Sequence, residues 1–338
     1  RVNTINNRSG LGTISLTNTG VVVSGVITAT SISVGGDAIS GASGFAYDNT
    51  SNIFSCSVTA LGSRTTGAHN FLAGTNAGCS ITSGSYNNFL GAYAGQCNTT
   101  GNYNNFLGQS AGYFNTTGAQ NNFLGYQAGH CNTTGQYNNF FGQNAGFANT
   151  TGGSNNFLGA VAGCSNTTGS GNNFFGSQAG RNNTTGGNNN FIGGSATGLC
   201  NTTGSHNNFL GANAGQCNTT GDHNFFGGLR AGCKNTTGRG NNFIGQEAGR
   251  YNTTGNYNKF IGYEAGRFAT TGSCNNFLGF NAGVNNTTGS QNNFLGSYAG
   301  YANTTGSNNN FLGNRAGCAN TTGEHNNFFG QSAGRCNT

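Results

Sequence analysis

The sequence predicts an all-β protein, a parallel β-solenoid (β-roll) of about 16 coils with a 17-residue repeat. First, the unit N-N-F-L-G-x-x-A-G-x-x-N-T-T-G-x-x recurs along most of the chain with a phenylalanine at a strict period. Second, this unit is too short for a helical hairpin, whose repeats need about 33 residues or more. Third, each unit holds two or three glycines, and each would cost about 1 kcal/mol in a helix. Strand and turn are the structures that remain.

The first phenylalanine of each unit marks the period. Successive positions are 17 residues apart, except for 18-residue steps from Phe71 to Phe89 and from Phe191 to Phe209. We expect each N-N-F-L-G segment to form a strand that pairs in register with the next coil, about 4.8 Å away. The A-G and T-T-G segments then form corners, where glycine accepts positive φ. The phenylalanines are Phe71, Phe89, Phe106, Phe123, Phe140, Phe157, Phe174, Phe191, Phe209, Phe226, Phe243, Phe260, Phe277, Phe294, Phe311 and Phe328.

Residues 1–66 do not carry the unit and are interpreted as a strand-rich cap and attachment segment. Residues 20–34 are rich in β-branched side chains and predict short strands, and Gly-Gly-Asp at 35–37 predicts a turn. Residues 45–67 suggest an irregular first coil, since a solenoid needs an atypical unit over its open edge. The solenoid array is predicted over 67–338, and we expect it to continue past the C-terminus because the chain stops inside a fresh N-T-T-G.

Both faces of the predicted strand are apolar. Adjacent residues on a strand point to opposite sides, so the phenylalanine faces the coil interior and the apolar residue after it faces outward. In only one coil, at Gly227, is that second residue not apolar. The residues assigned to the coil core and to an oligomer core include Phe89, Leu90, Phe106, Leu107, Phe123, Leu124, Phe157, Leu158, Phe277, Leu278, Phe294 and Leu295.

The outward apolar residues predict self-association. On a single rod they would form an exposed stripe roughly 70 Å long. We therefore expect a parallel homo-oligomer packed around this stripe. A homotrimer is favoured because three rods can enclose one apolar axis, and a dimer is the alternative.

The N-T-T segments match the N-glycosylation motif, but glycans on stacked coils about 4.8 Å apart would collide. We expect instead that each asparagine hydrogen-bonds its own turn and stacks into a ladder, and that threonine does the same. These turn and ladder residues are represented by Asn98, Thr99, Thr100, Gly101, Asn115 and Asn132.

Charge and composition argue against several classes of function. Charged residues are only 5% of the chain, and six acids spread over its length do not form a catalytic cluster, so neither an enzyme nor a cofactor is expected. The net charge of +6 includes no basic run, which disfavours nucleic-acid binding. No apolar stretch is long enough to span a membrane. All charges of the array except Lys259 occupy x positions, which we expect to face solvent.

Metal binding is also disfavoured. His206 and His223 share one position in adjacent coils, but no third ligand accompanies them. Calcium-binding solenoids carry an aspartate in every unit, and this array does not. The eleven cysteines include no C-x-x-C pair, and most precede N-T-T-G, where we expect them to act as small buried hydrophobes. Cys200 and Cys217 share a position in neighbouring coils, within disulfide reach of each other.

The repeated N-N-F-L-G-x-x-A-G-x-x-N-T-T-G unit resembles repeats in tail-fibre proteins of bacteriophages, especially those infecting cyanobacteria. It is similar, more loosely, to the N-[ST]-x-x-[LI]-G head repeats of trimeric autotransporter adhesins. Residues 25–31, Gly-Val-Ile-Thr-Ala-Thr-Ser, also resemble strand segments of cyanophage fibres. The resemblance implies a trimeric β-roll fibre that adheres to a host or cell surface. The unit departs from the adhesin heads in its greater length and its phenylalanine-rich strand.

The sequence therefore predicts a structural fibre or adhesin of a virion or cell surface, a rigid trimeric stalk for host or surface attachment. Its partners would be further copies of itself and a cell-surface glycan, with Tyr103, Tyr137, Tyr257 and Tyr298 as candidate surface contacts. The alternative is a self-assembling extracellular filament or sheath without a receptor. An ice-binding solenoid is less favoured, because the two threonines of each unit are adjacent and only one of them can face out.

Overall fold

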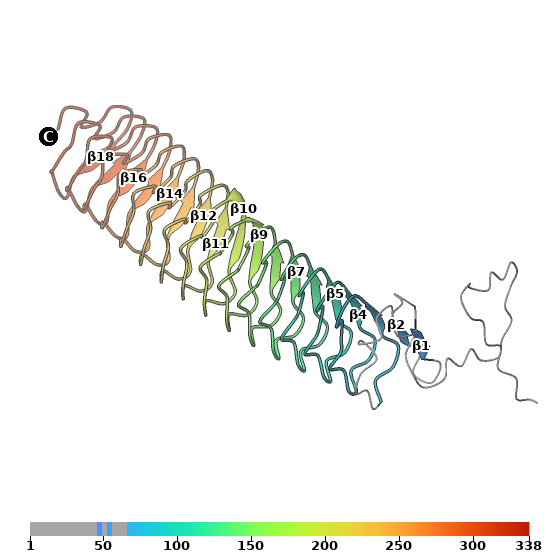
Figure 1. Ribbon diagram of the computed structural model, residues 1–338. Helices are drawn as coiled ribbons and strands as arrows, with labels where there is room; N and C mark the ends of the chain where they lie inside the picture. The colour runs from blue at the N-terminus through green and yellow to red at the C-terminus, as the bar shows by residue number, and fades with distance from the viewer. Residues whose placement is uncertain (1–45, 49–52, 56–65, 338) are drawn as a thin grey trace, which may run out of the picture. The chain divides into compact units, whose positions relative to one another are not determined.

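The computed structural model describes residues 46–48, 53–55 and 66–337. The chain divides into the units Arg1–Ala42 and Ser43–Thr338, and every described residue belongs to the second. The strands expected within residues 20–34 and the turn at 35–37 lie outside the described residues. From residue 66 onward the coils stack on one another along a single axis (Figure 1). The predicted β-solenoid with a 17-residue repeat is confirmed.

Each coil contributes one short strand to a single sheet. The strands are β1 (Ala46–Asp48), β2 (Ile53–Ser55), β3 (Phe71–Ala73), β4 (Asn88–Leu90), β5 (Asn105–Leu107), β6 (Asn122–Leu124), β7 (Asn139–Phe141), β8 (Asn156–Leu158), β9 (Asn173–Ser177), β10 (Asn190–Ser195), β11 (Asn208–Leu210), β12 (Phe225–Gly227), β13 (Asn242–Ile244), β14 (Lys259–Ile261), β15 (Asn276–Leu278), β16 (Asn293–Leu295), β17 (Asn310–Leu312) and β18 (Asn327–Phe329). From β2 to β18 every strand runs parallel to that of the next coil, and β1 pairs antiparallel with β2. Equivalent residues of neighbouring coils lie opposite each other, as Phe106 does with Phe123.

The backbone hydrogen bonds run mainly between coils. The Thr116 amide donates to the Thr133 carbonyl of the next coil at 2.9 Å, and the Gly112 amide donates to the Ala128 carbonyl at 2.9 Å. Within a coil, a tight turn is closed by the Asn115 amide, which donates to the Gly112 carbonyl at 3.0 Å. Buried backbone groups must be paired. A single coil therefore depends on both of its neighbours, as in other solenoids.

The core of most coils consists of one phenylalanine, one alanine and two asparagines. In the coil that starts at Asn104, these are Asn104, Phe106, Ala111 and Asn115, all fully buried. The Phe106 ring stacks on that of Phe123 with 4.8 Å between ring centroids and 7° between ring planes. This separation equals the spacing of neighbouring strands. The phenylalanines therefore form one column of stacked rings along the axis.

The two buried asparagines of each coil are held by hydrogen bonds to the adjacent coils. Asn104 donates from Nδ2 to the Gly118 carbonyl at 2.9 Å and accepts from the Asn121 amide at 3.0 Å. Asn115 donates from Nδ2 to its own turn, at the Gly118 carbonyl, and to Oδ1 of Asn98 in the preceding coil, at 2.9 and 2.7 Å. Polar groups can be buried here because nearly all of them have a partner. Oδ1 of Asn252 is an exception, since the equivalent residue of the next coil is Ala269.

The N-T-T-G residues chosen from the sequence lie in this network. Asn98 and Asn132 are fully buried beside their coil neighbours. Thr99 is half-buried and donates to the Thr116 carbonyl of the next coil at 3.2 Å, whereas Thr100 is exposed. Only one threonine of the pair is exposed here, and the asparagine side chains are enclosed rather than presented for glycosylation.

The glycine of T-T-G was expected to take positive φ, and this prediction is wrong. Gly108 and Gly112, at the end of the strand and in A-G, have φ of 138° and 58°, whereas Gly118 is not in the positive-φ region. Gly118 is needed for space, because a Cβ there would lie 2.5 Å from the Gly135 carbonyl oxygen of the next coil. Close backbone approach is the second common reason for glycine.

The sequence alignment of the first coil was also wrong. Leu72, not Phe71, pairs with Phe89, so the step between coils is 17 residues here as elsewhere. Leu72 is fully buried in the phenylalanine column, while Phe71 lies opposite Asn88 and is half-buried. A large apolar side chain is sufficient for this core position, and Leu72 supplies it.

The 18-residue step from Phe191 to Phe209 is present in the structure, where these two residues pair in neighbouring coils. Asn190 pairs with Asn208, and the extra residue forms an irregularity between Ile192 and Ser195. Such a bulge absorbs one residue without changing the register of the next coil. In this coil Thr197 takes the place of the core alanine, and its hydroxyl donates to the Gly211 carbonyl at 2.9 Å.

Replacing a core phenylalanine should open the array locally. We expect Phe157→Ala to lower the free energy of local opening by about 3–5 kcal/mol, because it empties part of the ring column. Leu158→Ala should cost about 1 kcal/mol in the isolated chain, since that side chain is largely outside the core. Amide hydrogen exchange around the substituted coil, measured in dilute solution, compares the two. Equal effects would contradict the assignment of inner and outer faces.

Val161 occupies a position that disfavours its side chain. Its φ is 53°, and the same position in the preceding coil is Asn144 with φ of 54°. The left-handed region costs about 1–2 kcal/mol for an ordinary residue and least for glycine and asparagine. We expect Val161→Asn to stabilise the array by about 1 kcal/mol and the reverse change, Asn144→Val, to destabilise it similarly. Thermal unfolding followed by circular dichroism tests both, and a loss of stability in Val161→Asn would refute the strain argument.

Candidate functional site

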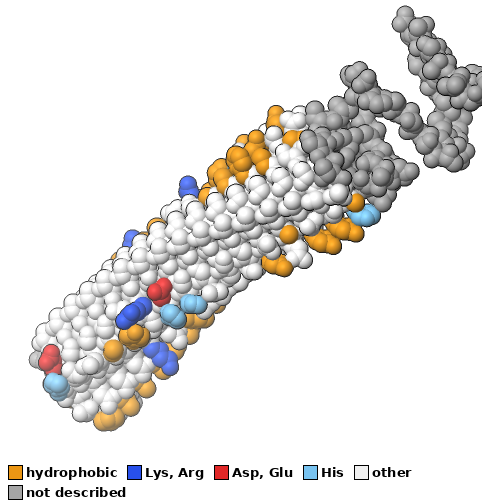
Figure 2. All heavy atoms as spheres, turned by 90° about the horizontal axis from the view of Figure 1, so that it is seen from below, with side chains coloured by type: hydrophobic (Ala, Val, Ile, Leu, Met, Phe, Trp, Pro, Cys, Tyr) orange, Lys and Arg blue, Asp and Glu red, His pale blue; other side chains and the backbone are white. Residues whose placement is uncertain are grey.

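The apolar residue that follows each core phenylalanine lies at the surface of the rod. Phe106 is fully buried, whereas Leu107 is 36% exposed and Ile192 is 41% exposed. We call the residues in this position the outer stripe: Leu90, Leu107, Leu124, Phe141, Leu158, Phe175, Ile192, Leu210, Ile244, Ile261, Leu278, Leu295, Leu312 and Phe329. Figure 2 shows hydrophobic side chains gathered in bands along the edges of the rod, with a broad polar surface between them. Thus, the strands have an apolar inner face and an apolar outer face.

A row of asparagine side chains lies beside the outer stripe, on the same face of the strands. In this amide ladder, Asn105 donates from Nδ2 to Oδ1 of Asn122 at 2.7 Å. Equivalent bonds link the coils from Asn88 to Asn208 and from Asn276 to Asn310. The side-chain amides satisfy one another along the axis, so this face consists of one apolar column and one hydrogen-bonded polar column.

Among the coils described from residue 66 onward, three depart from this arrangement. In β3, Phe71 and Ala73 occupy the ladder and stripe columns, and in β14 Lys259 replaces the ladder asparagine. The third coil is that of β12. In β12 the ladder asparagine is replaced by Phe225 and the outer-stripe residue by Gly227, while Phe226 keeps its place in the core. Phe225 is half-buried, and its ring lies beside Gly227, where an added Cβ would be 3.1 Å from Cε1 of Phe225. The ring therefore places apolar surface next to the position where the outer-stripe side chain is missing.

The irregular coil disrupts the amide ladder. Oδ1 of Asn242, in the coil after Phe225, is buried and has no hydrogen-bond partner. The same holds for Oδ1 of Asn276, which follows Lys259. A buried acceptor without a donor costs about 1–3 kcal/mol. Phe225 and Lys259, which replace asparagine in this column, thus each reduce the stability of the single rod.

Three of the four tyrosines chosen as surface contacts share one column. Tyr103, Tyr137 and Tyr257 lie just before a strand, with φ near 57–61° at the first two, and Tyr137 is 55% exposed. The Tyr103 ring stacks on that of Tyr86 with 4.9 Å between centroids and 4° between planes. Tyr298 lies in a different column and packs edge-on against Phe280. The structure therefore does not bring Tyr298 together with the other three.

The expectation that all x-position charges face solvent is wrong at Glu247, which is only 6% exposed. Its carboxylate lies 3.4 Å from Arg230 Nη1, 3.0 Å from Arg250 Nη1 and 2.9 Å from Arg267 Nε. Arg267 also pairs with Glu264 at 3.0 Å. A buried carboxylate is tolerated only with such partners. The spacing of 17 and 3 residues between these charges is the sequence signal that could have revealed the cluster.

Aromatic rings extend the charged cluster. The guanidinium carbon of Arg250 lies 5.0 Å from the centroid of the Tyr251 ring, and that of Arg267 lies 5.1 Å from the Phe268 ring. These two rings stack at 5.3 Å. A hydrogen bond to the Glu264 carboxylate raises the pKa of the Tyr263 hydroxyl. With every carboxylate engaged by arginine or tyrosine, the cluster ties neighbouring coils together.

The cysteines and histidines do not assemble a metal centre within the described residues, where no group of three or more metal-ligating side chains converges. The His206 and His223 rings lie 4.9 Å apart. All described cysteines are free thiols, including Cys200 and Cys217. Among the described cysteines only Cys233 is buried, so the expectation of buried cysteines is wrong for the other nine of this set, which are half-buried or exposed. Burial raises the pKa of the Cys233 thiol, which keeps it protonated and poorly nucleophilic.

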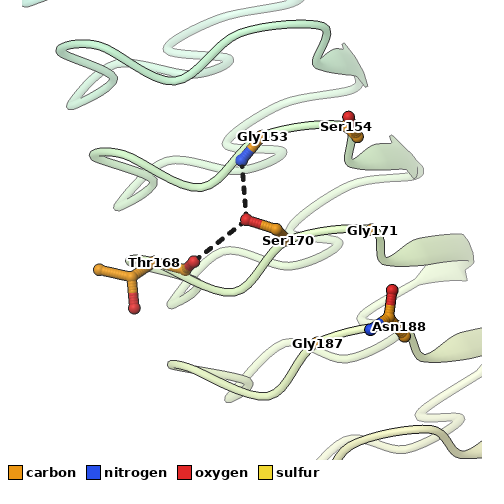
Figure 3. A pocket seen from close by; sticks show the side chains of 7 residues that line it. All are labelled: Gly153, Ser154, Thr168, Ser170, Gly171, Gly187 and Asn188. Carbon is orange, nitrogen blue, oxygen red and sulfur yellow. Dashed lines mark hydrogen bonds between the residues drawn. The ribbon is translucent and has the colours of Figure 1, made fainter.

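A shallow groove of about 490 Å³ crosses three coils where the surface side chains are small (Figure 3). Ser170 lies in its floor, donating to the Thr168 carbonyl at 3.3 Å and accepting from the Gly153 amide at 3.1 Å. The lining residues are Gly153, Ser154, Thr168, Ser170, Gly171, Gly187 and Asn188. This lining contains no acid, base or thiol, so it does not provide the groups that an active site needs.

In the described part of the chain, no helix has the length and apolarity needed to cross a bilayer. Comparisons with known protein families, with characterised proteins and with solved structures found no match. The resemblance to phage fibres and adhesin heads therefore stays a prediction. The outer stripe, with its amide ladder and its irregular coil at β12, is the candidate functional site.

Proposed function

We propose that the chain is a rigid, non-enzymatic fibre of a virion or cell surface, in which copies pack side by side through the outer stripe. The outer stripe supports this proposal because isolated soluble proteins rarely expose a long contiguous apolar surface. Three parallel copies would each turn the stripe toward a common axis and remove it from water. Closed rotational symmetry also limits the assembly to a defined number of copies.

The observation that carries the proposal is the placement of Phe225. Where the outer stripe loses its side chain at Gly227, the neighbouring ladder position changes from asparagine to phenylalanine, and the ring lies over the gap. This change leaves a buried carbonyl oxygen of Asn242 without a donor. A surface facing only water would gain nothing from restoring apolar area at such a cost. A surface facing another copy would gain contact.

The size of the outer stripe suits a stable interface. The fourteen steps between the strands of Leu90 and Phe329, at about 4.8 Å each, give a length of roughly 70 Å. A strip about 10 Å wide, covering the stripe and part of the ladder, would bury roughly 700 Å² on each partner. Two copies would bury roughly 1,400 Å² in total and three copies roughly 2,100 Å², which is in the size range of specific, stable protein interfaces.

Attachment is the second part of the proposal. Continuous hydrogen bonding between coils gives a stiff rod, which suits a stalk that holds a contact away from a surface. Tyr103, Tyr137 and Tyr257 are exposed along one column, and aromatic rings with a polar tip are common at recognition surfaces. We infer that this column contacts the host or cell surface, with a glycan as the expected ligand.

Sedimentation of the purified chain tests side-by-side assembly. We expect a species of three times the 34.3 kDa chain mass. Placing aspartates in the outer stripe, as Leu124→Asp, Leu210→Asp and Ile244→Asp, should shift it to monomer, because an unpaired charge cannot be buried in the interface. Tyr103→Ser and Tyr137→Ser, which change exposed residues outside the stripe, are matched controls and should leave the mass unchanged. A stable, soluble wild-type monomer would refute the proposed assembly.

Binding of the intact fibre to cells and to a glycan array tests attachment. We expect binding that falls about tenfold in a Tyr103→Ser, Tyr137→Ser and Tyr257→Ser variant, since each lost aromatic contact is worth about 0.5–1.5 kcal/mol. Tyr298→Ser, in the separate column, is the control. Fibres that assemble normally but bind neither cells nor glycans would instead support a filament or sheath without a receptor.

A further inference from the structure

The outer stripe is so regular that it would define the lateral position of a neighbouring copy but not its axial position. We call the strand segment that one coil contributes to this surface a rung. Most rungs present leucine, isoleucine or phenylalanine beside asparagine, at the same spacing throughout. A copy displaced along the axis by one coil would meet an almost identical surface and lose contact at only one terminal rung. Flat, repetitive strands are known to specify register weakly.

Among the rungs between the two ends of the array, the rung in β12 departs most from this regularity on the outer face. The first rung, in β3, has Phe71 in the ladder column and Ala73 in the stripe column, and β14 has Lys259 in the ladder column. At this rung the apolar bulk moves from the stripe column, where Gly227 has no side chain, to the ladder column, where Phe225 replaces asparagine. The rung also interrupts the ladder and leaves Oδ1 of Asn242 without a partner. A local departure from the repeat that costs stability is expected at a functional position.

Building on the proposed side-by-side assembly, we propose that Phe225 and Gly227 set the axial register between neighbouring copies. When parallel copies pack in register, the displaced ring and the vacant position of one copy face the same features in the next. A shift by one coil sets Phe225 against a regular rung and places a leucine or isoleucine over the backbone of Gly227. Each shift therefore creates mismatches on both copies, whereas a uniform stripe would create none in its interior.

A second copy of this chain is the occupant that fits this surface. A partner must repeat its side chains at the spacing of the coils, about 4.8 Å, over roughly 70 Å to contact every rung. Another rod with the same 17-residue unit meets this requirement, because its own coils repeat at the same spacing. It also carries the same displaced ring at the same coil, which a helix or an irregular surface would not supply.

Crosslinking of cysteines in the outer stripe can measure the register. Copies carrying Leu278→Cys are mixed with copies carrying Leu295→Cys and oxidised mildly, and the crosslinked peptides are identified by mass spectrometry. In register, like cysteines pair; after a shift of one coil, the mixed pair forms. We expect like pairs to dominate, and we expect Phe225→Asn with Gly227→Leu, which makes the rung regular, to lower the ratio of like to mixed pairs by about threefold or more, as registers become nearly equivalent.

A transplanted rung is the matched control. Adding Asn242→Phe and Ile244→Gly to the regularised chain moves the irregular rung by one coil in every copy, and the ratio should return to that of the wild type. An assembled, regularised chain with an unchanged ratio would overturn the role of Phe225 and Gly227 while leaving side-by-side assembly intact. A wild type that sediments as a monomer would instead remove the proposed assembly, and this inference with it.

Discussion

The in-register hydrogen bonds between successive coils are the constraint on which the other features of this structure depend. Backbone amides such as that of Thr116 reach the equivalent residue of the next coil, and the buried Asn115 side chain donates to the equivalent asparagine of the coil before. A bond between equivalent residues requires the same residue type, or a tolerated substitute, in each coil. This requirement explains why the asparagine, threonine and glycine positions repeat along the array. It also explains why one inserted residue must be expelled into a bulge between Ile192 and Ser195.

The same constraint converts a linear motif into columns on a surface. Each position of the unit becomes a line parallel to the axis, with one side chain about every 4.8 Å. The phenylalanine column fills the interior, and the residue after it forms the outer stripe. Because a coil contributes a strand of only three residues in most cases, the face available to a partner is narrow. Its length comes from repetition, and a long narrow contact suits another rod better than a globular partner.

Departures from the repeat carry the specific features of this chain. Phe225 and Gly227 alter the outer face at one rung and support both the proposed assembly and its proposed register. Glu247 pairs with Arg250 of its own coil and with Arg230 and Arg267 of the two neighbouring coils, and it is nearly fully buried. The groove near Ser170 arises where the side chains of adjacent coils are small. Because most coils share the same residues at each position, each of these sites can be identified by comparing its coil with the neighbouring coils.

The sequence by itself determined the period, the parallel strands and the opposition of Phe106 to Leu107, because these follow from alternation along a strand and from a repeat too short for helices. The spacing of Arg230, Glu247 and Arg267 was also visible, but its meaning depends on which columns lie close together in space. The tertiary structure decided that Leu72 rather than Phe71 enters the core, that Gly118 is required for space, and that the Phe225 ring lies beside Gly227. These features depend on contacts between coils. A periodic sequence does not determine which residues of neighbouring coils make these contacts; the three-dimensional stacking of the coils does.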